Sequence, residues 1–63
     1  MSKVKSHIDS LIQAAIENLD MGLLREAYEV MEYSQKHNQI SAQDAYVFDV
    51  MFESAAEMIE ELV

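Results

Sequence analysis

Apolar residues in the first third of the chain recur with helical spacing. They follow the i, i+3, i+4, i+7 pattern that places them on one face of a helix, at Val4, Ile8, Leu11, Ile12, Ala15, Ile16 and Leu19. This pattern predicts a helix over residues 3–19. Ser2 and Ser6 are both candidates for its N-cap, because a serine hydroxyl accepts a hydrogen bond from a free amide of the first turn.

The segment "LDMGLL", residues 19–24, interrupts this pattern. Asp20 is a good N-cap for a second helix. Gly22 costs about 1 kcal/mol inside a helix relative to alanine, so either a turn or a kink is expected at residues 20–22. The second helix is predicted over residues 22–37, and its apolar face comprises Leu23, Leu24, Ala27, Val30 and Met31, with Tyr28 at the edge. On the opposite face, Arg25 stands four residues before Glu29. Glu32 likewise stands four residues before Lys36, and this spacing favours ion pairs.

A polar connection, residues 36–41, precedes a third and longer helix that is predicted over residues 42–62. Ser41 is its expected N-cap, with Asp44 three residues later. Residues 45, 48, 52, 55, 59 and 62 form an apolar seam with alternating spacings of three and four. The apolar half is wider than one neighbouring helix requires. Its larger residues are expected to form the intra-chain core or a dimer core: Phe48, Met51, Phe52, Met58 and Ile59.

These elements predict an all-α fold, a small three-helix domain over residues 1–63 in which a helical hairpin is followed by a longer C-terminal helix. The sequence has no proline, one glycine and no sustained strand pattern. So short a chain buries only about 60% of the surface that its unfolded form exposes. It has no cysteine for disulfides, so support from a partner subunit is expected, most simply as a homodimeric bundle.

Charge is distributed unevenly along the chain. Twelve acidic residues oppose four basic ones, giving a formal net charge of −8. Asp49, Glu53, Glu57 and Glu61, called here the acidic row, recur every fourth residue, and no basic residue follows Lys36. Like charges at this spacing each destabilise a helix by a few tenths of a kcal/mol. Two interpretations stay open: a solvated face that keeps an apolar dimer soluble, or a recognition face for a basic protein, formed by Asp49, Glu53, Glu57, Glu60 and Glu61.

The residues that would carry catalysis or hold a cofactor are missing from the sequence. Neither His7 nor His37 follows a glutamate by three residues, as di-iron bundles require, and no calcium-loop or nucleophile-elbow pattern occurs. We therefore expect no enzymatic activity, no cofactor and no specific metal site, with weak cation binding by the acidic row as a minor hypothesis. The charge disfavours direct binding to nucleic acid or to anionic membranes. The absence of a signal-peptide pattern and of an apolar run near 20 residues predicts a cytoplasmic protein.

The segment "GLLREA", from Gly22 to Ala27, resembles the turn and second-helix start of tetratricopeptide and pentatricopeptide repeats. Ala15 stands where those repeats place a small residue in their first helix. Gln39 stands where they place proline, and the resemblance covers residues 11–41 once, whereas solenoids need about three repeats. A tight helical hairpin explains the same glycine and alanine.

The leading functional hypothesis is a small acidic regulator that binds and modulates a basic protein, with inhibition as the expected effect and a protein that handles nucleic acid as the expected partner, by analogy with inhibitors from phages and mobile elements. Its contact would combine the carboxylates with the apolar strip of the third helix, and Tyr33, on the polar side of the second helix, is the best single candidate for an exposed contact. This hypothesis requires that the carboxylates stay unpaired and that the phenylalanines are not enclosed. The alternatives are a homo-oligomerising assembly module with a merely solvating acidic face, and an inhibitor that mimics DNA.

Overall fold

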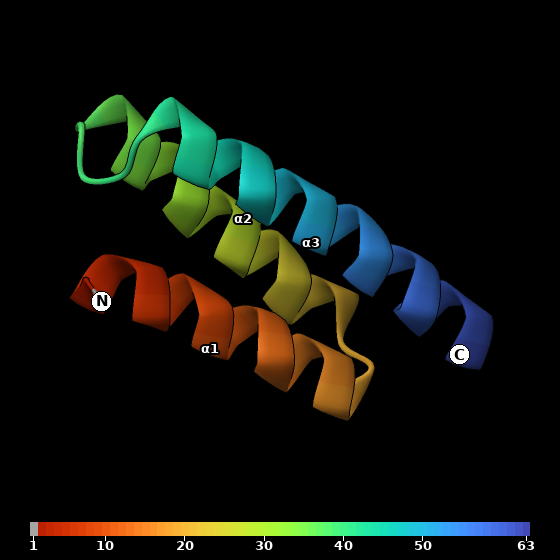
Figure 1. Cartoon of the computed structure of the whole chain (residues 1–63). Coiled ribbons are helices and arrows are strands. Elements are labelled where there is room, and N and C mark those ends of the chain that lie inside the picture. The colour runs from red at the N-terminus through yellow and green to blue at the C-terminus, as the bar shows by residue number, and fades with distance from the viewer. Residues whose placement is uncertain (1) are drawn as a thin grey trace.

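The computed structural model describes residues 2–63, and these form three α-helices without strands (Figure 1). The helices are α1 (Lys3–Asn18), α2 (Met21–Lys36) and α3 (Ala42–Leu62). The all-helical prediction is confirmed, and the predicted boundaries differ by at most one residue.

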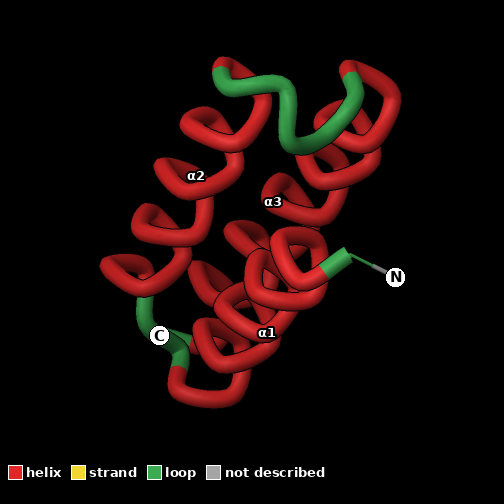
Figure 2. The backbone as a smooth tube through the Cα atoms, turned by 90° about the vertical axis from the view of Figure 1, so that its left-hand side faces the viewer, coloured by secondary structure: helices red, strands yellow, loops and turns green. Residues whose placement is uncertain are grey.

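The three helices alternate in direction. The two connections lie at opposite ends of the bundle (Figure 2), so α1 and α3 run the same way and α2 runs against both (Figure 1). The bundle measures 35 × 18 × 17 Å. With 21 residues against 16 in each of the others, α3 is the longest helix. Its C-terminal turn extends past the end of the bundle where α1 and α2 are joined.

Side-chain caps fix where each helix begins. The Ser2 hydroxyl accepts from the Lys5 amide, and the Asp20 carboxylate accepts from the Leu23 amide at 3.1 Å. A sharp turn, not a kink, separates α1 from α2, because Leu19 adopts the left-handed conformation at φ 50°. Gly22 lies inside the first turn of α2, so it does not make the turn itself. A Cβ added there would lie 3.2 Å from Asp20 Oδ1, and glycine therefore leaves room for this cap.

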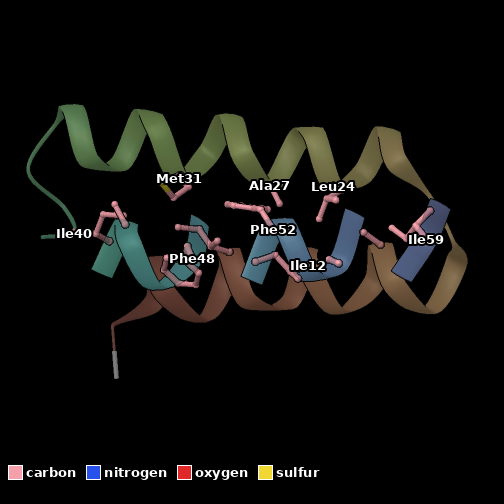
Figure 3. Packing of buried hydrophobic residues seen from close by; sticks show 12 residues of the cluster. Ile12, Leu24, Ala27, Met31, Ile40, Phe48, Phe52 and Ile59 are labelled. Carbon is pink, nitrogen blue, oxygen red and sulfur yellow. The ribbon is translucent and has the colours of Figure 1, made fainter. Parts of the chain in front are cut away.

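The core is a seam where all three helices meet (Figure 3). Met31, Ala27 and Leu24 of α2 point toward Ile12 of α1 and Phe52 of α3. Ala15 and Ala27 are fully buried, and such small residues allow the backbones of α1 and α2 to approach closely. The buried set comprises Ile8, Ile12, Ala15, Leu24, Ala27, Met31, Ile40, Ala45, Phe48, Phe52, Ala55 and Ile59.

The predicted seam of α3 is confirmed at residues 45, 48, 52, 55 and 59. It is wrong at Leu62, which is 65% exposed because the last turn of α3 projects beyond its neighbours. Two buried residues were not predicted. Ile40 lies in the connection interpreted as polar, and Ser34 is buried on α2, where its hydroxyl donates to the Val30 carbonyl at 2.8 Å.

Candidate partner-binding site

A groove with an apolar floor runs between α2 and α3. One part has a volume of about 310 Å³ and is lined by Met21, Leu24, Arg25, Tyr28, Phe52, Glu53 and Ala56. A second part shares Tyr28, Phe52 and Glu53 and adds Tyr46, Asp49 and Val50. Because the two parts share three residues, we treat them as one α2–α3 groove.

Two aromatic rings from different helices form the middle of this floor. Tyr28 of α2 meets Phe52 of α3 edge to face, with ring centroids 5.3 Å apart and an interplanar angle of 73°. Such a pair is more stable than its buried area alone implies, by about 1 kcal/mol. Tyr28 remains 40% exposed while Phe52 is buried. The floor is therefore held in place and still presents apolar surface to solvent.

The carboxylates beside the groove form no ion pair, although Arg25 lines the same part of the groove as Glu53. Within residues 2–63, the ion pair between Lys5 Nζ and Asp44 Oδ2, at 3.4 Å, is the one contact of this kind that the structure forms. The expected pairs Arg25–Glu29 and Glu32–Lys36 do not form, since solvent-exposed pairs gain little free energy from being held together. Asp49, Glu53, Glu57, Glu60 and Glu61 are all exposed and remain free of ion pairs.

The acidic row does not stay on one side of α3. Each step of four residues turns about 400°, so successive members are displaced by about 40° around the helix. Asp49 and Glu53 line the groove, whereas Glu57 and Glu61 fall outside it. The predicted acidic face is thus divided: its first two members border the groove, and the others face solvent beyond it.

The apolar residues predicted for α3 serve different places. Phe48, Phe52 and Ile59 are buried in the chain's own core, Met51 is half-buried against it, and Met58 is 43% exposed. Phe48 and Phe52 are each only 7% exposed, so the structure encloses both phenylalanines and does not provide the free strip that the leading hypothesis required. Phe52 contributes to the groove floor, and that is the phenylalanine surface within reach of a partner.

Tyr33 is exposed, at 60% of its surface, but it does not line the groove. Its ring packs on that of His37, one turn later, with centroids 4.1 Å apart and a tilt of 37°. The pair marks the C-terminal end of α2 and is separate from the groove.

Asp44 belongs to a helix cap, not to the groove. Its carboxylate accepts a hydrogen bond from the Ser41 amide, and the Ser41 hydroxyl accepts one from the Asp44 amide at 3.0 Å. The pKa of Asp44 is lowered from its ordinary value of 3.8. The largest cause is the hydrogen bond from the Ser41 backbone, followed by that with the Ser41 side chain, and the charge of Lys5 lowers it further.

Other kinds of site were sought over the same residues. In residues 2–63, no three His, Asp or Glu side chains converge on a position where they could share a metal ion. None of α1, α2 and α3 combines the length and apolar character needed to cross a bilayer.

The contribution of α2 to the groove was not predicted from the sequence. Met21, Leu24 and Arg25 line it, yet Leu24 was assigned to the core and Arg25 to an ion pair. Tyr28 gave the available signal, since an amphipathic aromatic residue at the edge of an apolar face is typical of a partly exposed contact.

Comparison with protein-family models, with curated proteins and with solved structures finds no match for this chain. The function is therefore inferred from the chemistry of the α2–α3 groove.

Proposed function

We propose that this chain is a non-enzymatic regulator that binds a basic protein through the α2–α3 groove and inhibits it. The observation that supports this proposal is the placement of the unpaired carboxylates of Asp49 and Glu53 beside an apolar floor. A partner that handles nucleic acid fits best, because such proteins carry the clustered lysines and arginines that a chain of charge −8 attracts.

The two kinds of surface contribute differently to binding. An apolar side chain of the partner would cover Tyr28 and Phe52 and provide most of the affinity, at roughly 25 cal/mol per Å² of apolar surface removed from water. Lysine or arginine side chains on both sides of it would approach Asp49 and Glu53. Complementary charge chiefly raises the association rate and selects the partner.

Mimicry of DNA is the weaker alternative. Members of the acidic row lie about 6 Å apart along the axis, whereas phosphates follow one another every 3.4 Å along a strand. The rotation of about 40° per step also carries Glu57 and Glu61 away from Asp49 and Glu53. By contrast, an apolar side chain flanked by basic side chains matches the groove, in which Asp49 and Glu53 lie beside an apolar floor.

The regulator is proposed to act as a homodimer. Chains of this size usually need additional support, and large apolar side chains remain exposed on α3, among them Val47, Met58 and Leu62. The alternative from another class is an assembly module in which the acidic residues only keep the oligomer in solution.

A pair of charge-reversal variants separates these possibilities. The double variant Asp49→Lys, Glu53→Lys alters the groove, and its control Glu57→Lys, Glu61→Lys makes the same change in net charge outside the groove. The probe is a 15-residue helical peptide of leucine and lysine, titrated by calorimetry at low and at physiological salt. We expect the groove variant to lose at least tenfold in affinity and the control to lose less than threefold.

Equal losses in both variants would indicate recognition by net charge alone, as in a mimic of DNA. Unchanged binding in both, together with unchanged capture of proteins from a lysate, would leave the assembly module as the function.

A further inference from the structure

The flank of α3 that faces away from the α2–α3 groove carries an apolar strip of four residues: Val47, Met51, Met58 and Leu62. At about 100° per residue they fall within a sector of about 60°. Val47, Met58 and Leu62 are 53%, 43% and 65% exposed, and Met51 is half-buried. The strip lies on the side of α1, since Asp44, in the same sector, contacts Lys5.

The charge pattern indicates what covers this strip. Between Val47 and Leu62 no acidic residue falls in the sector, although α3 carries six acidic residues and no basic one. A basic partner would find no carboxylate there. Two copies of a chain with charge −8 repel each other over most of their surfaces, and this strip allows them to meet without bringing carboxylates into contact. The strip therefore fits a second copy.

The order of residues in the strip is symmetric. Val47 and Leu62 lie equally far from the midpoint between Ser54 and Ala55, and so do Met51 and Met58. We infer that two copies pair antiparallel along α3 about a twofold axis at this midpoint, with Val47 against the partner's Leu62 and Met51 against the partner's Met58. Small residues at the centre allow the helices to approach to about 8–10 Å. This inference rests on the proposed homodimer and not on the groove.

The antiparallel direction has an electrostatic reason as well. A parallel pair would bring Glu60 and Glu61 of both copies to the same end, next to two negative helix termini. An antiparallel pair separates these residues by the length of the helix and places each C-terminus beside an N-terminus. The twofold axis also makes the interface self-complementary, as closed dimers require.

Cysteine cross-linking tests this arrangement directly, because the chain has no cysteine of its own. In the antiparallel pair two Ser54 residues are offset by one residue, about 1.5 Å along the axis, whereas two Val47 residues are about 22 Å apart. Disulfides need Cα atoms within about 7 Å. Under mild oxidation we expect Ser54→Cys to form a covalent dimer and Val47→Cys alone to form none. A mixture of Val47→Cys and Leu62→Cys chains should form the mixed dimer.

A second measurement uses Met58→Glu, which introduces a carboxylate into the strip, with Tyr46→Glu as the control on the same helix outside it. By light scattering we expect Met58→Glu to raise the dimer dissociation constant by about 100-fold or more, because an unpaired charge would be buried twice. Tyr46→Glu should leave it within threefold. Circular dichroism checks that each variant stays helical.

The outcomes separate this inference from the proposed function. A wild-type chain that stays monomeric at several hundred micromolar would overturn both the strip and the homodimer. A stable dimer in which Val47→Cys cross-links with itself, or in which Met58→Glu has no effect, would overturn the antiparallel strip and leave the dimer standing. Binding of the leucine–lysine peptide by Met58→Glu tests the groove separately, and we expect that binding to be unchanged.

Discussion

The α1–α2 hairpin and helix α3 differ in the size of the side chains that they bury and in the residues that they leave exposed. In the hairpin, the small residues Ala15 and Ala27 are fully buried, and acidic and basic residues occur together. Helix α3 inserts Phe48 and Phe52 into the core and leaves large apolar residues and free carboxylates on its outer sides. Surface open to further contacts therefore lies mainly on α3, with a contribution from α2 in the groove.

This difference indicates where the proposed partners would bind. A helix that served stability alone would not combine six acidic residues with exposed Val47, Met58 and Leu62. Repulsion between like charges and uncovered apolar surface both reduce the stability of the isolated chain. A bound basic protein would neutralise the carboxylates, and a second copy would cover the exposed apolar side chains.

Ala15→Leu should have the largest effect, because it changes the packing of the hairpin. Ala15 is fully buried, so the added carbon atoms would force α1 and α2 apart. We expect the free energy of unfolding to fall by about 1–3 kcal/mol, a large part of the roughly 5 kcal/mol typical of a small domain. Urea denaturation followed by circular dichroism measures it.

Ala14→Leu is the matched control, because Ala14 is half-buried on the same helix. We expect a change of no more than about 0.5 kcal/mol, as at other sites outside the core. If both substitutions cost the same, the close packing at Ala15 is not what stabilises the hairpin.

The elements of this fold could be predicted from the sequence because local signals agreed. The apolar period, the caps at Ser2, Asp20 and Ser41, and the polar stretch before Ser41 all indicated the same three helices. Ile40 and Ser34 were missed because their burial depends on how the connection folds back over the bundle, and no pattern within a few residues carries that information.

The candidate site was predicted in part. The sequence indicated which residues were acidic, but a spacing of four residues was interpreted as one continuous face, and the accumulated rotation of α3 divides it. The groove also needs Met21 and Tyr28 of α2 beside Phe52 of α3. Such a juxtaposition of two helices depends on their tertiary packing, which periodicity in a single helix does not specify.

Ser41→Ala should have the next largest effect, this time at the start of α3. The Ser41 hydroxyl satisfies the Asp44 amide, and the Asp44 carboxylate satisfies the Ser41 amide in return. Removal of an N-cap costs about 1 kcal/mol. Thermal unfolding of Ser41→Ala, compared with the exposed Ser10→Ala, should show a loss in the cap variant alone.

The same cap gives a dependence on pH. The pKa of Asp44 is lowered in the folded chain from its ordinary value of 3.8, so its stabilising effect is fully present above that value and is lost as the pH falls below it. The stability difference between the wild type and Asp44→Asn should therefore shrink as urea titrations move from pH 7 to pH 2.5. A difference that stays constant over this range would show that the charge of Asp44 is irrelevant to the cap.

Glu57→Lys should give the smallest effect and tests whether the carboxylates of α3 repel one another. On α3 the new lysine lies four residues from both Glu53 and Glu61 and near the negative end of the helix, so we expect a gain of a few tenths of a kcal/mol at low salt. On α2, Glu29→Lys places a cation four residues after Arg25 but three residues from both Glu26 and Glu32, so repulsion and attraction oppose each other and the gain should be smaller. In about 1 M salt, where the Debye length is near 3 Å, the advantage of Glu57→Lys should largely vanish. An equal gain in both helices would mean that net charge alone, and not the unneutralised carboxylates of α3, limits the stability of the chain.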